Sequence, residues 1–238
     1  MISVCIAAYN GAAYVEQQIK SILCQLSVTD ELIITDDGSS DDTVKIIQSF
    51  RDHRIKLIRN DKRLGYSMNF SKAIGLAKGD YVFLSDQDDV WRHDKISQCV
   101  EALKTHEIVA HDAQIFYSNS GTHAEYYSQF VRPNISFFGN LVKIRFLGCC
   151  LAMRKSVASE LFPLVGLKYL THDGLICVVG SFFYSFKYIS NPLIYYRRHD
   201  HNTSQGHQKN KNTLFVKLHI RLNFLLALFR IMILKLMR

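Results

Sequence analysis

The sequence predicts an open α/β fold, in which a mixed, mostly parallel sheet carries helices on both faces. Three observations lead to this prediction. Over the first 110 residues, apolar runs typical of strands alternate with segments of helical spacing. The strand-like runs are continuously apolar, as expected of parallel strands that are covered on both faces. The chain has 238 residues and is 48% hydrophobic, which is enough for one sizeable globular domain.

The first half contains the most regular segments. The expected strands cover residues 2–8, 31–36, 54–60, 80–86 and 107–118. The expected helices cover residues 12–25, 41–50, 67–77 and 93–104. Ser39 or Ser40 is expected to be the N-cap of the second helix, because serine hydroxyls accept hydrogen bonds from the free amides of a helix start. Since ligands of open α/β sheets bind outside the carboxyl ends of the strands, the residues that follow each strand are the candidates for a site.

The second half is less regular. A short helix is expected at residues 137–144, a strand at 145–155, a helix at 172–183 and a strand at 187–199. Gly148 lies within the second of these segments and predicts a close approach of another part of the chain to the backbone. No internal repeat or low-complexity linker interrupts the pattern before about residue 200.

The net charge of +8 is concentrated at the end of the chain. From His201 onward there are seven Lys or Arg residues and no Asp or Glu, which leaves the first 200 residues close to neutral. The main domain therefore lacks the basic surface of a general polyanion binder, and we expect no nucleic-acid partner.

Cysteine usage and the first residues bear on the compartment. The six cysteines show no C-x-x-C spacing and most lie in apolar runs, which favours reduced core thiols in a cytoplasmic protein. The chain begins directly with a strand-like segment instead of a charged and then apolar leader, so we expect no signal peptide.

An acidic cluster, TDDGSSDDT, follows the second expected strand. Its later Ser and Asp residues fit the capping of the next helix, where acidic side chains complement the helix dipole. Asp36 and Asp37 at the strand end are not explained by capping. Their carboxylates can accept hydrogen bonds from a base N–H or from ribose hydroxyls, although a purely structural role stays open on local grounds.

A second acidic cluster, LSDQDDVW, contains Asp86, Asp88 and Asp89. If the strand continues through it, Asp86 and Asp88 point to the same side, since residues i and i+2 share a face. Two carboxylates this close disfavour each other's ionised form unless a cation lies between them. We therefore expect Mn²⁺ or Mg²⁺, which prefer oxygen ligands and bind substrate phosphates. A solvated acidic loop is the alternative.

Five segments occur together in an order that resembles family-2 glycosyltransferases, which are inverting enzymes with the GT-A fold. They are CIAAYNGAAYVEQQIKSIL, IITDDGSSDDT, NDKRLGYSMNFSKAI, GDYVFLSDQDDVW and THDGLICVVG, and the resemblance covers roughly residues 1–200. SDQDDVW and the later NPLIYYRRHDHNTSQ are most similar to the bacterial rhamnosyltransferase-like branch, which builds surface polysaccharides.

The resemblance implies roles for particular positions. Around the nucleotide-sugar it places Ala8, Tyr9, Asn10, Asp36, Asp37, Gly65, Asn69, Asp86, Gln87, Arg198 and His199. The pair Asp86 and Asp88 matches the metal-binding D-x-D motif of the family, with Asp88 as the more direct ligand of Mn²⁺ or Mg²⁺ and Asp86 nearer the ribose. Arg198 and His199 would lie near the diphosphate, and a basic loop next to a basic tail is the alternative for them.

The resemblance also implies a catalytic base. Asp173 in THDG occupies the position of the family's acidic base, and His172 beside it would orient or contact the acceptor. The structural alternative is that Thr171 or Asp173 caps the helix that begins there. Cys149 and Cys150 would lie near the acceptor, as packing residues rather than nucleophiles.

The division into domains follows from the resemblance and from the charge pattern. Residues 1–205 are expected to form the GT-A domain, with 1–110 binding the nucleotide-sugar and 111–205 binding the acceptor. Residues 206–238 are expected to form a basic, apolar helix that lies in the membrane interface, with packing on the domain or on a dimer partner as the alternative. The protein would then be cytoplasmic and peripheral at the inner face of the plasma membrane.

These features together predict an inverting glycosyltransferase that moves a sugar, rhamnose or a hexose, from a nucleotide-diphosphate sugar to a glycan or lipid-linked acceptor. The alternative is a non-catalytic, sugar-nucleotide-binding subunit of an assembly complex. A nucleotidyltransferase is disfavoured, because YNGAAY lacks the glycine-rich phosphate loop and basic residue that such enzymes carry near the N-terminus.

Overall fold

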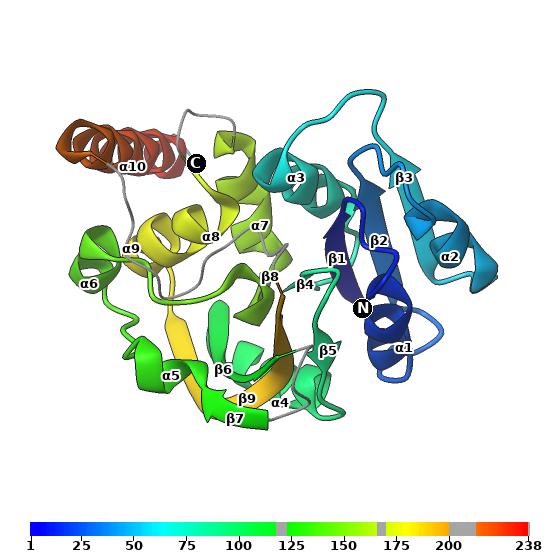
Figure 1. Ribbon diagram of the computed structural model, residues 1–238. Coiled ribbons are helices and arrows are strands. Elements are labelled where there is room, and N and C mark those ends of the chain that lie inside the picture. The colour runs from blue at the N-terminus through cyan, green and yellow to red at the C-terminus, as the bar shows by residue number, and fades with distance from the viewer. Residues whose placement is uncertain (118–122, 166–169, 200–212, 238) are drawn as a thin grey trace.

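The structure, a computed structural model, describes residues 1–117, 123–165, 170–199 and 213–237. Its described strands form one sheet in the order β3-β2-β1-β4-β8-β6-β9-β5, with β7 paired to β6 (Figure 1). The strands are β1 (Ile2–Ala8), β2 (Glu31–Asp36), β3 (Ile55–Arg59), β4 (Tyr81–Ser85), β5 (Val90–Trp91), β6 (Ile108–Tyr117), β7 (His123–Tyr126), β8 (Leu151–Arg154) and β9 (Phe186–Arg198).

The two halves of the sheet differ in strand direction. Strands β1 to β4 are mutually parallel, as their uninterrupted apolar runs predict. Strand β8 is antiparallel to both β4 and β6, and β9 runs parallel to β6. The short β5 pairs with β9 at the far edge of the sheet. Because β5 follows β4 after only four residues, the acidic segment between them runs from the centre of the sheet toward that edge.

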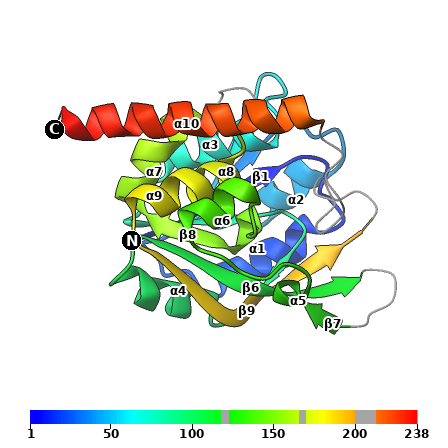
Figure 2. The same cartoon turned by 90° about the vertical axis from the view of Figure 1, so that its left-hand side faces the viewer.

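Helices cover both faces of this sheet, as predicted (Figures 1 and 2). One face carries α1 (Val15–Leu23), α2 (Thr43–Ser49) and α4 (Lys95–Leu103), which pack around Ile34, Phe83 and their neighbours. The other face carries α3 (Tyr66–Leu76), α7 (Lys155–Leu161), a helical segment over 172–183 and α10 (Leu214–Leu236). The short helices α5 (Tyr127–Phe130) and α6 (Phe137–Val142) complete the second half.

Most expected elements are present, but one helix and one strand begin at residues other than those predicted. Helix α2 begins at Thr43 with Asp42 as its N-cap and no side-chain cap, so the N-cap prediction for Ser39 or Ser40 is wrong. The Ser39 hydroxyl instead accepts a hydrogen bond from the Asn10 amide at 2.9 Å. The strand expected from residue 145 begins only at Leu151, since Gly148–Cys150 form a 3-10 turn.

The helical segment over 172–183 is predicted correctly as helical but is not regular. It consists of α8 (His172–Gly174), a π-helical stretch (Leu175–Gly180) and α9 (Ser181–Phe183). All six π-helical residues are buried. Irregular turns of this kind are frequent at functional sites, and this one lies directly after the predicted base.

Helix α10 packs along the main domain through one narrow face. Phe224, Ala227 and Ile231 are buried in the same core as the 172–183 segment. Packing of the C-terminal helix on the domain, the alternative to a membrane-interface helix, is therefore observed for the face that carries these three residues. Among the described residues no helix is both long enough and apolar enough to cross a membrane.

Candidate active site

The carboxyl ends of β1, β2 and β4 meet at one edge of the sheet, as expected for parallel strands. Gln87, just beyond β4, ties two of them together. Its side-chain oxygen accepts from the Tyr9 amide and its side-chain nitrogen donates to the Tyr9 carbonyl, both at 2.9 Å. Gln87 thus holds residues 86–89, here called the acidic loop, against the end of β1.

The end of β1 is shaped by a backbone turn. Asn10 has a φ of +48°, a left-handed conformation that asparagine tolerates better than most residues. Its side-chain oxygen accepts from the Ser40 amide at 2.9 Å, which ties this turn to the loop after β2. The Tyr9 side chain is half-buried, and the Arg63 guanidinium lies 3.9 Å from the centroid of its ring. A flat aromatic ring with a cation above it is a suitable lining for a phosphorylated nucleoside.

Asp36 and Asp37 are both buried and accept hydrogen bonds from backbone amides, Asp36 within its own loop and Asp37 from the loop before α3. Asp36 accepts from Ser39 N at 3.1 Å. Asp37 accepts from Leu64 N at 2.7 Å and from Gly65 N at 2.8 Å. These bonds fold the loop before α3 over the end of β2. The structural role that was left open is therefore observed, and a nucleoside contact by either carboxylate stays a prediction.

Helix α3 begins in this loop. Gly65 precedes it with a φ of +81°, a conformation that a side chain disfavours. Asn69, almost fully buried, donates to the Thr35 carbonyl at 2.8 Å and accepts from the Asn60 amide group at 2.9 Å. The two residues thus set the position of the loop and helix beside the sheet edge, and their contact with a nucleotide is likewise a prediction.

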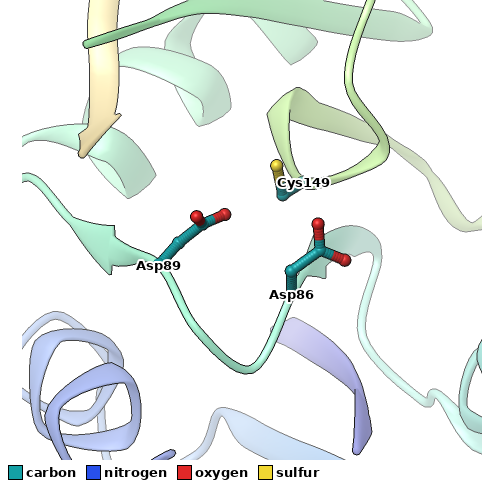
Figure 3. Close-up of side chains that lie close together, drawn as sticks. All are labelled: Asp86, Asp89 and Cys149. Atoms are coloured by element: carbon teal, nitrogen blue, oxygen red, sulfur yellow. The ribbon is translucent and has the colours of Figure 1, made fainter. Parts of the chain in front are cut away.

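The acidic loop after β4 brings Asp86 and Asp89 together with Cys149. One ligand atom from each residue lies within 4.8 Å of the others. Figure 3 shows the two aspartates on the two arms of the loop, directed toward the segment that carries Cys149. Asp89 is fully buried, and among the described residues its Oδ2 has no hydrogen-bond partner. A buried, unpartnered carboxylate oxygen is costly, so it needs a proton or a cation.

The electrostatics of this cluster agree with its geometry. Burial, and then the charge of Asp88, raise the pKa of Asp86 from 3.8 to about 7. Burial, with Asp88 and Asp86 behind it, also raises the pKa of Asp89 well above its ordinary value. Burial raises the pKa of the Cys149 thiol as well. The ionised forms of Asp86 and Asp89 are therefore disfavoured in this cluster, and a bound divalent cation would stabilise them.

The pairing expected within the loop differs from the one observed. The prediction that Asp86 and Asp88 face one point assumed an extended strand end, but β4 stops at Ser85 and the chain bends at Gln87 and Asp88. The i, i+2 rule therefore does not apply there. Asp86 groups with Asp89 and Cys149 instead, while Asp88 Oδ2 lies 2.8 Å from His199 Nε2.

The end of β9 fixes the acidic loop from the opposite side. The Arg197 amide donates to Asp89 Oδ1 at 3.1 Å, and its Nε donates to the Asp88 carbonyl at 2.7 Å. His199 stacks on Tyr14 from the start of α1, with ring centroids 4.6 Å apart. Arg198 is the last residue of β9 and is paired in register with Tyr117 of β6. The sequence-predicted basic segment therefore does reach the acidic loop.

A buried lysine, Lys95, binds the turn that carries Cys149 of the cluster. Lys95 is fully buried, and its Nζ donates to the Cys149 carbonyl at 2.8 Å. The same ammonium lies 4.0 Å from the centroid of the Trp91 ring. Burial lowers the pKa of Lys95, while the charge of Asp89 acts in the opposite direction. Lys95 thus links α4 to the 3-10 turn that carries Cys149.

His172 and Asp173 lie at the start of α8. The expected cap is present, since Thr171 Oγ1 accepts from Gly174 N at 3.2 Å. His172 is buried, stacks on Phe70 at 4.4 Å, and has its Nε2 next to Gly148, where a Cβ atom would lie only 2.6 Å away. The predicted close approach at Gly148 is thereby confirmed. Both roles predicted for His172, orienting and acceptor contact, stay predictions.

Asp173 belongs electrostatically to the same site. Its charge contributes to the raised pKa values of Asp86 and of Tyr66 at the start of α3. Its Oδ1 accepts from the Gly174 amide at 2.9 Å. The fold therefore brings the acidic loop of the first half and the predicted base of the second half into one region.

Comparison with known proteins identifies the family. The sequence profile described as Glycosyl transferase family 2 matches residues 3–162. The chain belongs to glycosyl transferase family 2. It is also 28% identical over 224 residues to dTDP-rhamnosyl transferase RfbG of Shigella flexneri, covering 82% of this chain and 72% of that protein. The predicted family is thus confirmed, and RfbG is a relative of the kind that the rhamnosyltransferase-like resemblance implies.

Two other relatives of this family 2 chain are matched over only part of their own length. An uncharacterized glycosyltransferase of Nostoc sp. is 29% identical over 212 residues, which are 84% of this chain and 66% of that protein. A β-1,3-glucosyltransferase of Escherichia coli, WfaP, is 36% identical over 108 residues, which are 45% of this chain and 43% of that protein. The chain thus spans between two fifths and three quarters of these three curated relatives.

Solved structures confirm the fold of this family 2 chain. Staphylococcus aureus TarS, residues 1–349, superposes with a TM-score of 0.64 at 16% identity, over 82% of this chain and 60% of that one. The mannosyltransferase PcManGT from Pyrobaculum calidifontis, solved with GDP-Man and Mn²⁺, gives a TM-score of 0.56 at 19% identity, over 80% and 54%. The predicted GT-A fold is therefore correct.

Proposed function

We propose that this chain is an inverting glycosyltransferase of polysaccharide biosynthesis that takes its sugar from a nucleotide-diphosphate donor. The observation that carries the proposal is the cluster at the carboxyl end of β4, in which Asp89 and Cys149 are buried and Asp86 is partly buried. Family membership supplies the reaction class. The relative RfbG, named a dTDP-rhamnosyl transferase, favours a deoxythymidine diphosphate donor with rhamnose, and hexose donors are the second choice.

The residues of the cluster fit a divalent cation. Asp89 Oδ2 is buried without a partner among the described residues, and two carboxylates with raised pKa values face each other. Asp86 and Asp89 would hold Mn²⁺ or Mg²⁺, with Asp88 adjacent, because hard cations prefer carboxylate oxygens. Such a cation would neutralise charge on the departing diphosphate. PcManGT, which shares the fold, was solved with GDP-Man and Mn²⁺, and this supports a divalent cation beside the donor.

The remaining residues divide between binding and proton transfer. The Tyr9 ring with Arg63, and the turn at Asn10, would line the nucleoside pocket. Asp173 would accept the proton of the attacking hydroxyl, since an inverting transfer needs one base on the acceptor side. Burial lowers the pKa of His172, so its ring is neutral beside that carboxylate. A neutral, packed imidazole would orient Asp173 without competing for the proton.

The acceptor is proposed to be a glycan or lipid-linked saccharide. Two Escherichia coli relatives are named as glucosyltransferases acting on α-D-GlcNAc-diphosphoundecaprenol, which supports a lipid-linked acceptor of this kind. A non-catalytic subunit that only binds a sugar nucleotide is the alternative. The occupied base position and the intact acidic cluster favour catalysis.

The test is a panel of sugar nucleotides incubated with Mn²⁺, Mg²⁺ or chelator, in the presence of polyprenyl-diphosphate saccharides, with release of nucleoside diphosphate as the readout. We expect acceptor-dependent release with one donor. Asp173→Asn should lower kcat by about 100- to 10,000-fold while the donor dissociation constant stays within about twofold of the wild-type value. Glu16→Gln, at an exposed position in α1, is the control. Donor binding without turnover by the wild type would favour the non-catalytic alternative.

A further inference from the structure

Helix α10 presents an apolar face to solvent. Its 23 residues make a helix roughly 35 Å long. The inner face packs on the domain through Phe224, Ala227 and Ile231. The opposite face, here called the outer face, carries these exposed apolar side chains: Phe215, Leu218, Leu222, Leu225, Leu226, Phe229, Met232, Ile233 and Leu236. An exposed apolar strip of this size marks an interaction surface.

Successive helical residues are 100° apart, which locates the basic side chains of α10 relative to this face. Arg221 and Arg230 border it on opposite edges, and no charged residue lies between them on the outer face. Lys235 turns inward, where its Nζ lies 3.2 Å from Glu160 Oε2. The helix contains no acidic residue. An apolar face with cations along both edges is the arrangement found in helices that lie in an anionic membrane interface.

Neighbouring elements extend the outer face. The Arg221 guanidinium donates to the Val142 carbonyl at 3.4 Å, which places the end of α6 beside α10. Phe138 and Val142 on α6 and Phe182 on α9 are also exposed. Phe137 joins these two elements through edge contacts with both Phe138 and Phe182. Figure 2 shows α6 and α9 beneath α10 on the same side of the molecule.

The inner face of α10 contacts the segment that carries the predicted base. A Cβ atom at Gly174 would lie 2.8 Å from Phe224 Cζ, so the helix rests directly on the residue after Asp173. A surface bound along the outer face would thus lie about one helix diameter from Gly174, the residue after Asp173. That spacing suits an acceptor whose lipid part stays in the surface while its saccharide reaches the site.

We propose that the outer face of α10, together with Phe138, Val142 and Phe182, docks on an anionic bilayer and presents Asp173 to a membrane-embedded acceptor. The acceptor part of this inference rests on the proposed function, while the docking part does not. Apolar side chains insert at the level of the lipid headgroups, and Arg221 and Arg230 contact their phosphates. The docking is interfacial, since the inner face of the same helix is committed to the domain core.

The test is co-sedimentation of the full chain with vesicles made of equal parts phosphatidylglycerol and phosphatidylcholine. The wild type should partition onto them, and the double variant Leu222→Glu/Phe229→Glu should lose about tenfold or more in partition coefficient. Arg230→Gln should bind these vesicles several-fold less and pure phosphatidylcholine vesicles unchanged. Val28→Glu, 76% exposed in a loop after α1, is the matched control and should bind as the wild type does.

The outcomes separate docking from catalysis. Binding of the double variant equal to that of the wild type would overturn the docking surface. The docking surface would also be refuted if the wild type did not bind vesicles and light scattering showed that it forms a dimer through Leu222 and Phe229. A detergent-dispersed acceptor should be used equally well by the wild type and the double variant. Vesicle binding by a wild type without any transferase activity would leave the surface standing and would refute the proposed function instead.

Discussion

His199 Nε2 lies 2.8 Å from Asp88 Oδ2, although 111 positions separate the two residues in the sequence. The contact joins the end of β9, next to the edge strand β5, to the loop that leaves β4 at the centre of the sheet. Arg197, two residues earlier, binds the same loop through its amide and its guanidinium. The acidic loop is therefore held in place by a strand from the second half of the chain.

Removal of this contact should weaken donor and cation binding. In His199→Ala the Asp88 carboxylate loses a charge-assisted partner worth about 1.5 kcal/mol, so we expect the KM for the donor to rise about tenfold. The fall in kcat should be smaller, because His199 acts on the donor side of the reaction through its bond to Asp88. The control is His53→Ala, which removes a histidine from an exposed loop. Equal donor KM values for His199→Ala and the wild type would show that the contact has no part in binding.

The stability of the cation-free protein should depend on pH through Asp86. The folded pKa of Asp86, about 7, lies above its ordinary value of 3.8, because the site is buried and Asp88 is near. Its contribution to stability is therefore complete below about pH 4 and is lost as the pH rises through about 7. In chelator, urea unfolding should show a decrease of up to about 4 kcal/mol across this window.

Asp86→Asn removes the ionisable group, so its unfolding free energy should change much less over the same window. Added Mn²⁺ should restore stability to the wild type above about pH 7, because cation binding requires the ionised carboxylate. Parallel pH profiles for the wild type and Asp86→Asn in chelator would contradict the assigned pKa.

Gly148 and Gly75 offer a matched pair of substitutions. A methyl group at Gly148 would lie 2.6 Å from His172 Nε2, whereas Gly75 in α3 has open space around it. Gly148→Ala should therefore lower the unfolding free energy by about 1–3 kcal/mol and displace His172. Gly75→Ala should be neutral or stabilising by up to about 1 kcal/mol, since alanine favours helix. Equal effects of the two substitutions, measured by urea denaturation, would exclude the close approach.

Lys95 should act as a positioning residue for the cluster. Lys95→Met keeps the aliphatic stem but removes the donor to the Cys149 carbonyl, which is buried with it. We expect a loss of about 1–3 kcal/mol in unfolding free energy and weaker Mn²⁺ binding, because the turn that carries Cys149 loses its anchor. Lys104→Met, at an exposed position after α4, is the control. Unchanged Mn²⁺ affinity in a folded Lys95→Met protein would show that the anchor is irrelevant to the site.

The sequence predicted those parts of the fold that depend on local pattern. Continuous apolar runs identified β1, β2 and β4, and helical spacing identified α1 and α3, because both signals arise within a few residues. The N-cap of α2 was missed because Ser39 bonds to Asn10, a residue 29 positions away. Competition from a distant partner leaves no trace in the local pattern.

The candidate site was predicted in outline only. The acidic character of the loop after β4 is visible in the sequence, but its pairing depends on the bend at Gln87, which is set by bonds to Tyr9. Lys95 was missed as a member of the site, and Cys149 was expected only as a packing residue near the acceptor. Neither residue carries a motif, and both reach the acidic loop through packing of separate elements. Only burial, which follows from the complete fold, reveals that Asp89 Oδ2 lacks a partner.

Calorimetric titration of Mn²⁺ into the protein, in the presence of a nucleoside diphosphate, tests the central claim most directly. The claim is that the acidic loop binds a divalent cation together with the diphosphate of the donor. The wild type should bind one Mn²⁺, and Asp89→Asn should weaken that binding by about tenfold or more. Asp42→Asn, at an exposed position before α2, should leave it unchanged. Equal Mn²⁺ affinity in the wild type and in Asp89→Asn would contradict the account.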